Sequence, residues 1–123
     1  MPTRKSDVIR LRHMFDACKK ALQFTKEKSR NDLETDEQLT LALVRLMEIL
    51  GEAATKVTLE VQNRHLLIPW KRIIGTRNRL IHGYDKVNLD ILWQIITVDL
   101  PDLSNSLQIA ILQEEQNEQQ RLM

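Results

Sequence analysis

Apolar residues recur at intervals of three and four along most of the chain, the spacing that places side chains on one face of an α-helix. The first stripe predicts a helix over residues 6–29, and the second predicts a helix from Thr35 or Asp36 to Val61. Three more stripes follow, over residues 70–81, from residue 89, and beyond Pro101. In order, the stripes are Val8, Leu11, Phe15, Cys18 and Leu22; Leu39, Leu43, Leu46, Leu50, Ala53, Val57 and Val61; Trp70, Ile73, Ile74, Leu80 and Ile81; Leu89, Leu92, Trp93 and Ile96; and Leu103, Leu107 and Ile111.

Glycine and proline mark where these helices should begin, end or bend. Pro69 is a good first residue for the third helix, and Gly83 should cap the end of that helix. Pro101 either kinks the fourth helix or separates it from a fifth. Gly51 lies inside the second helix at a cost of about 1 kcal/mol relative to alanine, which is usually tolerated where another helix crosses closely.

The length of 123 residues leaves room for one domain, because domains commonly need about 100 to 200 residues. Hydrophobic residues make up 42% of the chain and charged residues 28%, which is typical of soluble proteins. No apolar signal segment follows Met1, so we expect a cytoplasmic protein. We therefore predict a single domain over residues 1–123, in which residues 113–123 form a frayed helix or a polar tail.

The chain contains only three glycines, three prolines and one cysteine. So few turn-forming residues predict an all-α protein, an antiparallel bundle of four to five helices joined by short loops. Cys18 alone excludes an intramolecular disulfide and a multi-cysteine metal site. Glycine-rich nucleotide loops and the HExxH zinc motif are absent, and His13 and His65 are isolated residues that we expect at the surface or its rim. We predict no metal site and no cofactor.

Arg77 interrupts the apolar stripe of the third helix. Burying an unpaired guanidinium would cost several kcal/mol, so Arg77 must meet a carboxylate, reach solvent along its stem, or face a cleft that a ligand enters. Glu48 and Glu52, on the second helix, are the candidate partners. A buried ion pair between the two helices would account for Arg77 without any function.

His82 and Tyr84 lie at the predicted end of the same helix. His82 comes one turn after Asn78 and flanks an edge that it shares with Arg77, so Arg77 and His82 could converge on one group. A histidine in this place can also simply cap the last carbonyls, and a tyrosine can simply pack its ring on the bundle.

Positive charge is concentrated in residues 64–86, which contain six basic residues and one acidic residue. This segment carries a charge of +5 in a chain whose net charge is +1. Such a pattern fits polyanion binding, and it is equally typical of a solvated face. No aromatic residues alternate with the cations, so no base-stacking platform is predicted.

The segment from Arg77 to Tyr84 reads Arg-x4-His-x-Tyr. This motif resembles the signature of the HEPN superfamily, and specifically of the HepT-like toxin ribonucleases, which include the terminal tyrosine. Arg-x4-His alone would be a weak signal, but the surrounding sequence resembles the same family over nearly the whole chain. The matching segments are Gly51-Glu52-Ala53-Ala54, Ile68-Pro69-Trp70, Ile74-Gly75, Trp93 and Asp99-Leu100-Pro101.

The resemblance implies an all-α HEPN bundle that forms a homodimer, with the motif of each subunit facing a shared cleft. Arg77 and His82 would then be the catalytic pair of a metal-independent RNA endonuclease, and Asn78 the polar residue that supports them. Tyr84 would be the residue to which a partner, a minimal nucleotidyltransferase antitoxin, adds AMP. Three cations of the basic segment would bind the RNA substrate: Lys71, Arg72 and Arg79.

This chemistry would also explain the arginine within an apolar stripe. RNA cleavage without a metal needs a base for the 2′-OH proton, which His82 can be, and a cation for the phosphate charge, which Arg77 can be. Two other functions stay open: a non-catalytic HEPN subunit that binds nucleotide or holds substrate for a nucleotidyltransferase, and a helical dimer without a ligand. An open cleft at the motif favours the first two functions, and a closed core with a buried Arg77 favours the third.

Overall fold

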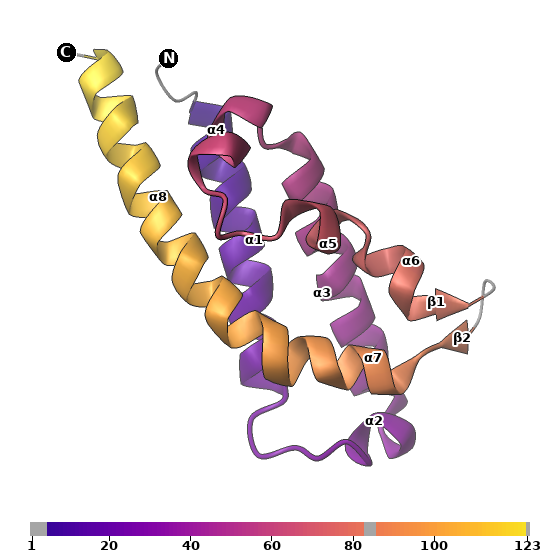
Figure 1. Cartoon of the computed structure of the whole chain (residues 1–123). Coiled ribbons are helices and arrows are strands. Elements are labelled where there is room, and N and C mark those ends of the chain that lie inside the picture. The colour runs from indigo at the N-terminus through magenta and orange to yellow at the C-terminus, as the bar shows by residue number, and fades with distance from the viewer. Residues whose placement is uncertain (1–4, 83–85, 123) are drawn as a thin grey trace.

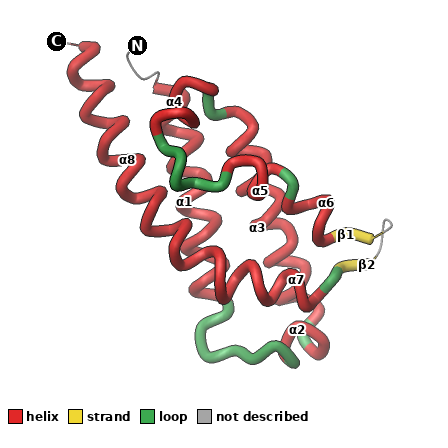
Figure 2. Tube along the Cα trace, viewed as in Figure 1, coloured by secondary structure: helices red, strands yellow, loops and turns green. Residues whose placement is uncertain are grey.

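The computed structural model describes residues 5–82 and 86–122. Apart from one short hairpin, the described residues form helices and their connections, which confirms the predicted all-α class (Figures 1 and 2). The elements are α1 (Lys5–Phe24), α2 (Asp32–Thr35), α3 (Glu37–Lys56), α4 (Leu59–Arg64), α5 (Trp70–Ile74), α6 (Thr76–Leu80), β1 (Ile81–His82), β2 (Lys86–Val87), α7 (Leu89–Gln94), the π-helical turn η1 (Ile95–Asp99) and α8 (Leu100–Leu122).

Three long helices build the bundle, with α1 packed against both α3 and α8 and antiparallel to each (Figure 1). The apolar stripes predicted for the second and fifth helices are buried in full. The first stripe is buried at Val8, Leu11 and Cys18, while Phe15 and Leu22 are half-buried. Helix periodicity therefore identified most of the core.

The predicted second helix is two helices, which corrects the expectation of one helix running to Val61. Asp36 caps α3 by accepting a hydrogen bond from the Leu39 amide at 3.1 Å. The chain becomes extended at Val57, and Thr58 caps the short helix α4. Asp7, buried on α1, holds this break by accepting hydrogen bonds from the Thr58 backbone N–H at 2.9 Å and from its hydroxyl at 3.1 Å.

The predicted third helix is also divided, because it turns at Gly75 and ends at Leu80 instead of Ile81. The Gly75 amide donates to the Lys71 carbonyl at 2.9 Å, and a Cβ at Gly75 would lie only 3.2 Å from that oxygen. After Leu80 the chain forms the antiparallel hairpin β1–β2, with Ile81 opposite Val87.

Pro101 leaves the path of the fourth helix continuous (Figure 2). The wider turn η1 precedes it, and the Leu100 amide donates to the Ile95 carbonyl five residues back. Proline lacks an N–H and its ring clashes with the carbonyl four residues earlier, so a π-helical turn here relieves the clash and bends the helix into α8.

The C-terminal segment is helical to Leu122, so of the two forms expected for residues 113–123, a frayed helix or a polar tail, the described residues 113–122 have the helical one. Glu114 on this segment is fully buried. Its carboxylate accepts two hydrogen bonds from Arg64, at 2.8 and 3.2 Å, and lies 2.5 Å from His65 Nε2. The His65 side chain is nearly buried while the residue as a whole is half-buried, so His65 lies at the rim of the surface and not on it. Glu114 is thus buried against the polar side chains of Arg64 and His65, and the spacing of apolar residues cannot reveal a contact of this kind.

Candidate functional site

Arg77 lies on the short helix α6, whose inner side is held by buried Thr76 and Leu80. The Thr76 hydroxyl donates to the Arg72 carbonyl at 3.0 Å and fixes α6 to the end of α5. The Arg77 side chain is 69% exposed, and its Nε lies 3.9 Å from Glu48 Oε2 on α3. Glu48 is one of the two predicted partners, but the pair is loose and open to solvent instead of buried.

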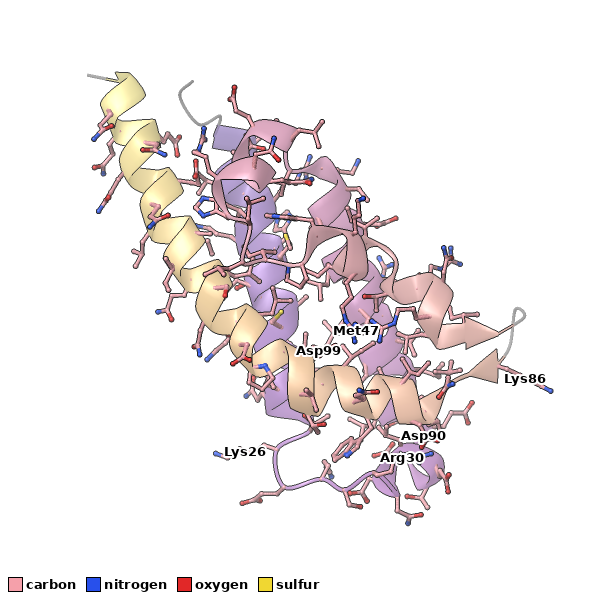
Figure 3. The ribbon with its side chains drawn as sticks, in the orientation of Figure 1. Lys26, Arg30, Met47, Lys86, Asp90 and Asp99 are labelled. Carbon is pink, nitrogen blue, oxygen red and sulfur yellow. The ribbon has the colours of Figure 1, made fainter. Side chains whose placement is uncertain are left out.

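An open hollow of about 160 Å³ lies beside Arg77, between α3 and the α5–α6 segment. Its α3 side is formed by Met47, Glu48, Gly51, Glu52 and Thr55, and Figure 3 labels Met47 on that helix. A Cβ at Gly51 would lie 3.3 Å from the Ile73 carbonyl, so this glycine lets α5 approach α3 closely, as predicted. The hollow contradicts a closed core around Arg77.

His82 follows Arg77 by five residues but is not on the helix. It lies in β1, opposite Lys86 of β2, and the Asn88 amide donates to the Leu80 carbonyl at 2.7 Å where the hairpin closes. The helical angle between Arg77 and His82 that the sequence predicted therefore does not apply. Lys86 is exposed and points away from the bundle (Figure 3). Gly83 and Tyr84 lie outside the described residues, so the place of Tyr84 stays a prediction. The predicted helix cap at Gly83 was wrong, because α6 ends at Leu80 and its C-cap is Ile81.

The other predicted site residues do not all share the Arg77 hollow. Asn78 and Lys71 are exposed, on α6 and α5 respectively. Arg72 and Arg79 line a second hollow, on a different side of α5–α6, where Arg72 Nη2 donates to Asp99 Oδ2 at 3.4 Å. The basic segment is thus divided between two faces and the buried pair of Arg64 with Glu114.

The second hollow was not predicted from the sequence. Its lining comes from α3, from residues 67–79 and from residues 95–106, three stretches that are separated along the chain, and it includes carboxylates at Asp99 and Asp102. Nothing in the local spacing of those residues signals that the fold brings them to Arg72 and Arg79.

The described part of the chain contains neither a group of metal ligands nor a helix that could span a membrane. Among residues 5–82 and 86–122, no three His, Cys, Asp or Glu side chains are grouped as metal ligands. No helix within the same ranges combines the length and apolar character that a membrane span requires.

Comparison with known proteins identifies the family. Residues 14–110 match the family model described as "Ribonuclease HepT-like". The chain is 38% identical over 105 residues to a protein of Caldanaerobacter subterraneus named "Putative RNase TTE0752", covering 85% of this chain and 93% of that protein. It is 31% identical over 86 residues to "Probable ribonuclease HepT" of Thermococcus cleftensis, covering 70% and 78% of the two chains.

A third relative, "Putative RNase MJ1380" of Methanocaldococcus jannaschii, is 28% identical over 97 residues, covering 79% of this chain and 89% of that protein. No solved structure matches the chain at a significant level. The matched segment contains α3, the Arg77 hollow and the whole Arg-x4-His-x-Tyr motif. By sequence, by its all-α fold and by this motif, the chain belongs to the HepT-like ribonucleases of the HEPN superfamily.

Proposed function

We propose that this protein is a metal-independent RNA endonuclease and the toxin of a toxin–antitoxin pair, with Arg77 and His82 as its catalytic residues. The observation that carries the proposal is the Arg77 guanidinium, which is mostly exposed at an open hollow and comes five residues before His82. A structural arginine would be expected in a tight buried pair instead. Membership of a ribonuclease family supplies the reaction class.

The reaction divides between the two residues in a simple way. His82 accepts the proton of a ribose 2′-OH, and the resulting oxygen attacks the adjacent phosphorus. The bond from phosphorus to the 5′-oxygen breaks, that oxygen takes up a proton, and the RNA is left with a 2′,3′-cyclic phosphate and a 5′-hydroxyl end. Arg77 stabilises the negative charge that gathers on the phosphate oxygens, for which its planar fork of donors is well shaped.

Glu48 leaves Arg77 free for this role. A separation of 3.9 Å is too long for a hydrogen bond, and such exposed ion pairs contribute only about 0–1 kcal/mol. A phosphate group can therefore replace Glu48 as the partner of the Arg77 guanidinium at a small cost in free energy. Asn78, exposed on the same helix, would support the pair by hydrogen bonding, and Lys71, Arg72 and Arg79 would bind RNA on either side of α6.

The active form is proposed to be a homodimer in which two copies of the motif face one cleft. The proposed antitoxin is a minimal nucleotidyltransferase that adds AMP to Tyr84, two residues after His82. The added phosphodiester would bring bulk and negative charge beside the catalytic pair, which opposes RNA binding.

The central test is expression of variants followed by growth and RNA integrity measurements. His82→Ala should abolish growth arrest and RNA cleavage, because a general base contributes roughly 10²- to 10⁴-fold. Arg77→Lys should be nearly as inactive as Arg77→Ala, because lysine keeps the charge but loses the fork. Arg45→Ala, which removes an exposed arginine of α3, is the control and should stay toxic.

Several outcomes would contradict the proposal. Full cleavage by a folded His82→Ala protein would remove His82 from the reaction and favour the non-catalytic HEPN subunit. Mixing Arg77→Ala and His82→Ala subunits tests the shared cleft, since activity returns only if a site uses both chains. Co-expression with the nucleotidyltransferase should add the mass of AMP to this chain, and Tyr84→Phe should prevent that addition.

A further inference from the structure

The second hollow is the largest of the cavities described above, with a volume of about 260 Å³. It lies between the α5–α6 segment and the η1–α8 segment, and the Arg77 hollow lies on the other side of α6. Its floor is apolar and includes the buried side chains of Leu50, Ile73 and Ile95. Pockets for drug-sized ligands span about 300–1,000 Å³, so this one suits a smaller, flat group such as a single base.

Opposite charges line the two walls of this hollow. Arg72 and Arg79 come from the α5–α6 wall, while Asp99 and Asp102 come from the η1–α8 wall. Figure 3 labels Asp99 in η1, where the chain passes from α7 into α8. Among the described residues, the hydrogen bond that joins the walls, from Arg72 to Asp99, is long at 3.4 Å, and the two side chains are 50% and 30% exposed. Both groups therefore keep hydrogen-bonding capacity for a ligand.

We propose that this hollow binds a guanine base of the RNA substrate. Guanine carries two acceptors, O6 and N7, on one edge and two donors, N1–H and the N2 amino group, on another. Arginine is the usual partner of O6 and N7, and a carboxylate accepts hydrogen bonds from base amino groups. Adenine, cytosine and uracil do not separate two acceptors from two donors in this way, so they match oppositely charged walls less well.

The position of the hollow suits a base near the cleaved bond. Arg79 comes two residues after Arg77, so at about 100° per residue it points to nearly the opposite side of α6. A strand that crosses α6, a helix about 10 Å wide, can therefore offer a phosphate to Arg77 and a neighbouring base to the hollow. Unstacked bases of single-stranded RNA are the ones that proteins commonly read by such pockets. The inference rests on the proposed ribonuclease function.

The test measures binding of octanucleotides that are 2′-O-methylated throughout and so cannot be cleaved through the 2′-OH. An oligouridine with one central guanosine should bind wild-type protein roughly five- to a hundredfold more tightly than oligouridine alone or with one central adenosine. Asp102→Asn and Ser106→Phe, which remove a wall charge and fill the hollow, should abolish the guanosine preference. Asp16→Asn, an exposed aspartate of α1, is the charge-matched control and should keep it.

The outcomes separate this inference from the proposed function. If wild-type protein cleaves no RNA, the ribonuclease proposal fails, while the binding measurement still decides whether the hollow takes guanine. If RNA is cleaved but guanosine confers no tighter binding, or Asp102→Asn keeps the preference, the guanine pocket is refuted. A change of oligomeric state in Ser106→Phe, measured by sedimentation, would show that a second copy of the chain fills the hollow and would overturn the proposal.

Discussion

Replacing Glu114 with alanine should destabilise the protein far more than replacing its neighbour Glu115. Both residues are glutamates on α8, and both form an ion pair with an arginine. Glu114 is fully buried and accepts from Arg64 through both oxygens, whereas Glu115 and its partner Arg12 are 39% and 53% exposed. The hydrogen bond that Arg64 donates to Glu114 also raises the pKa of Arg64, so the guanidinium stays charged.

The size of the effect follows from what each substitution leaves behind. Removing one partner of a buried pair costs about 3–5 kcal/mol, because the other charge stays buried without compensation. The Arg64 side chain is 28% exposed and can regain some water, so the low end, about 3 kcal/mol, is expected for Glu114→Ala. Exposed ion pairs contribute only about 0–1 kcal/mol to stability. Glu115→Ala should therefore cost no more than that, even though Glu115 and Arg12 lie as close as 2.7 Å.

Urea and thermal unfolding of the two variants measure this difference. A loss of 3 kcal/mol should lower the Tm of a domain of this size by roughly 10 °C, and Glu115→Ala should lower it by less than about 4 °C. Equal losses for the two variants, or a loss below about 1 kcal/mol for Glu114→Ala, would refute the reasoning that burial sets the strength of the pair.

Three further predictions concern the bundle. In urea unfolding, Gly51→Val should lower the free energy of unfolding by about 1–3 kcal/mol, because the valine side chain would press on the Ile73 carbonyl. Ala53→Gly should leave the contact between residue 51 and Ile73 unchanged. Burial raises the pKa of the Cys18 thiol from 9.0 to about 12, so stability should fall as the pH rises from 9 towards 12, and this fall should be smaller in Cys18→Ala. Thr58→Ala should cost about 1 kcal/mol by removing the α4 cap, and Thr58→Ser should restore most of it.

The long helices could be predicted from the sequence because their cores are made of apolar residues at regular spacing. Leu43, Leu50 and Leu107 fall on those stripes and are fully buried. The breaks at Thr58 and Gly75 could not be predicted in this way, because they depend on Asp7 from another helix and on close backbone contacts. Glu114 was missed for the same reason, since its partners come from a distant segment.

The candidate site was only partly predictable. The Arg-x4-His-x-Tyr spacing singled out Arg77 and His82, and Glu48, which lies near Arg77, was one of the two candidate partners predicted for it. The sequence pattern predicted His82 at the end of a helix. In the structure the helix ends at Leu80, and His82 lies in the first strand of the hairpin. Pairing between β1 and β2 overrides helix propensity here, and two-residue strands leave no periodic signal.

The most direct measurement is cleavage of RNA by purified wild-type and His82→Ala proteins in excess EDTA, with mass analysis of the new ends. We predict that the wild-type protein cleaves without added metal and leaves 2′,3′-cyclic phosphate and 5′-hydroxyl ends, while the folded His82→Ala protein is at least about 100-fold slower. Cleavage that stops in EDTA, 5′-phosphate ends, or equal rates for the two proteins would contradict the metal-independent mechanism through Arg77 and His82.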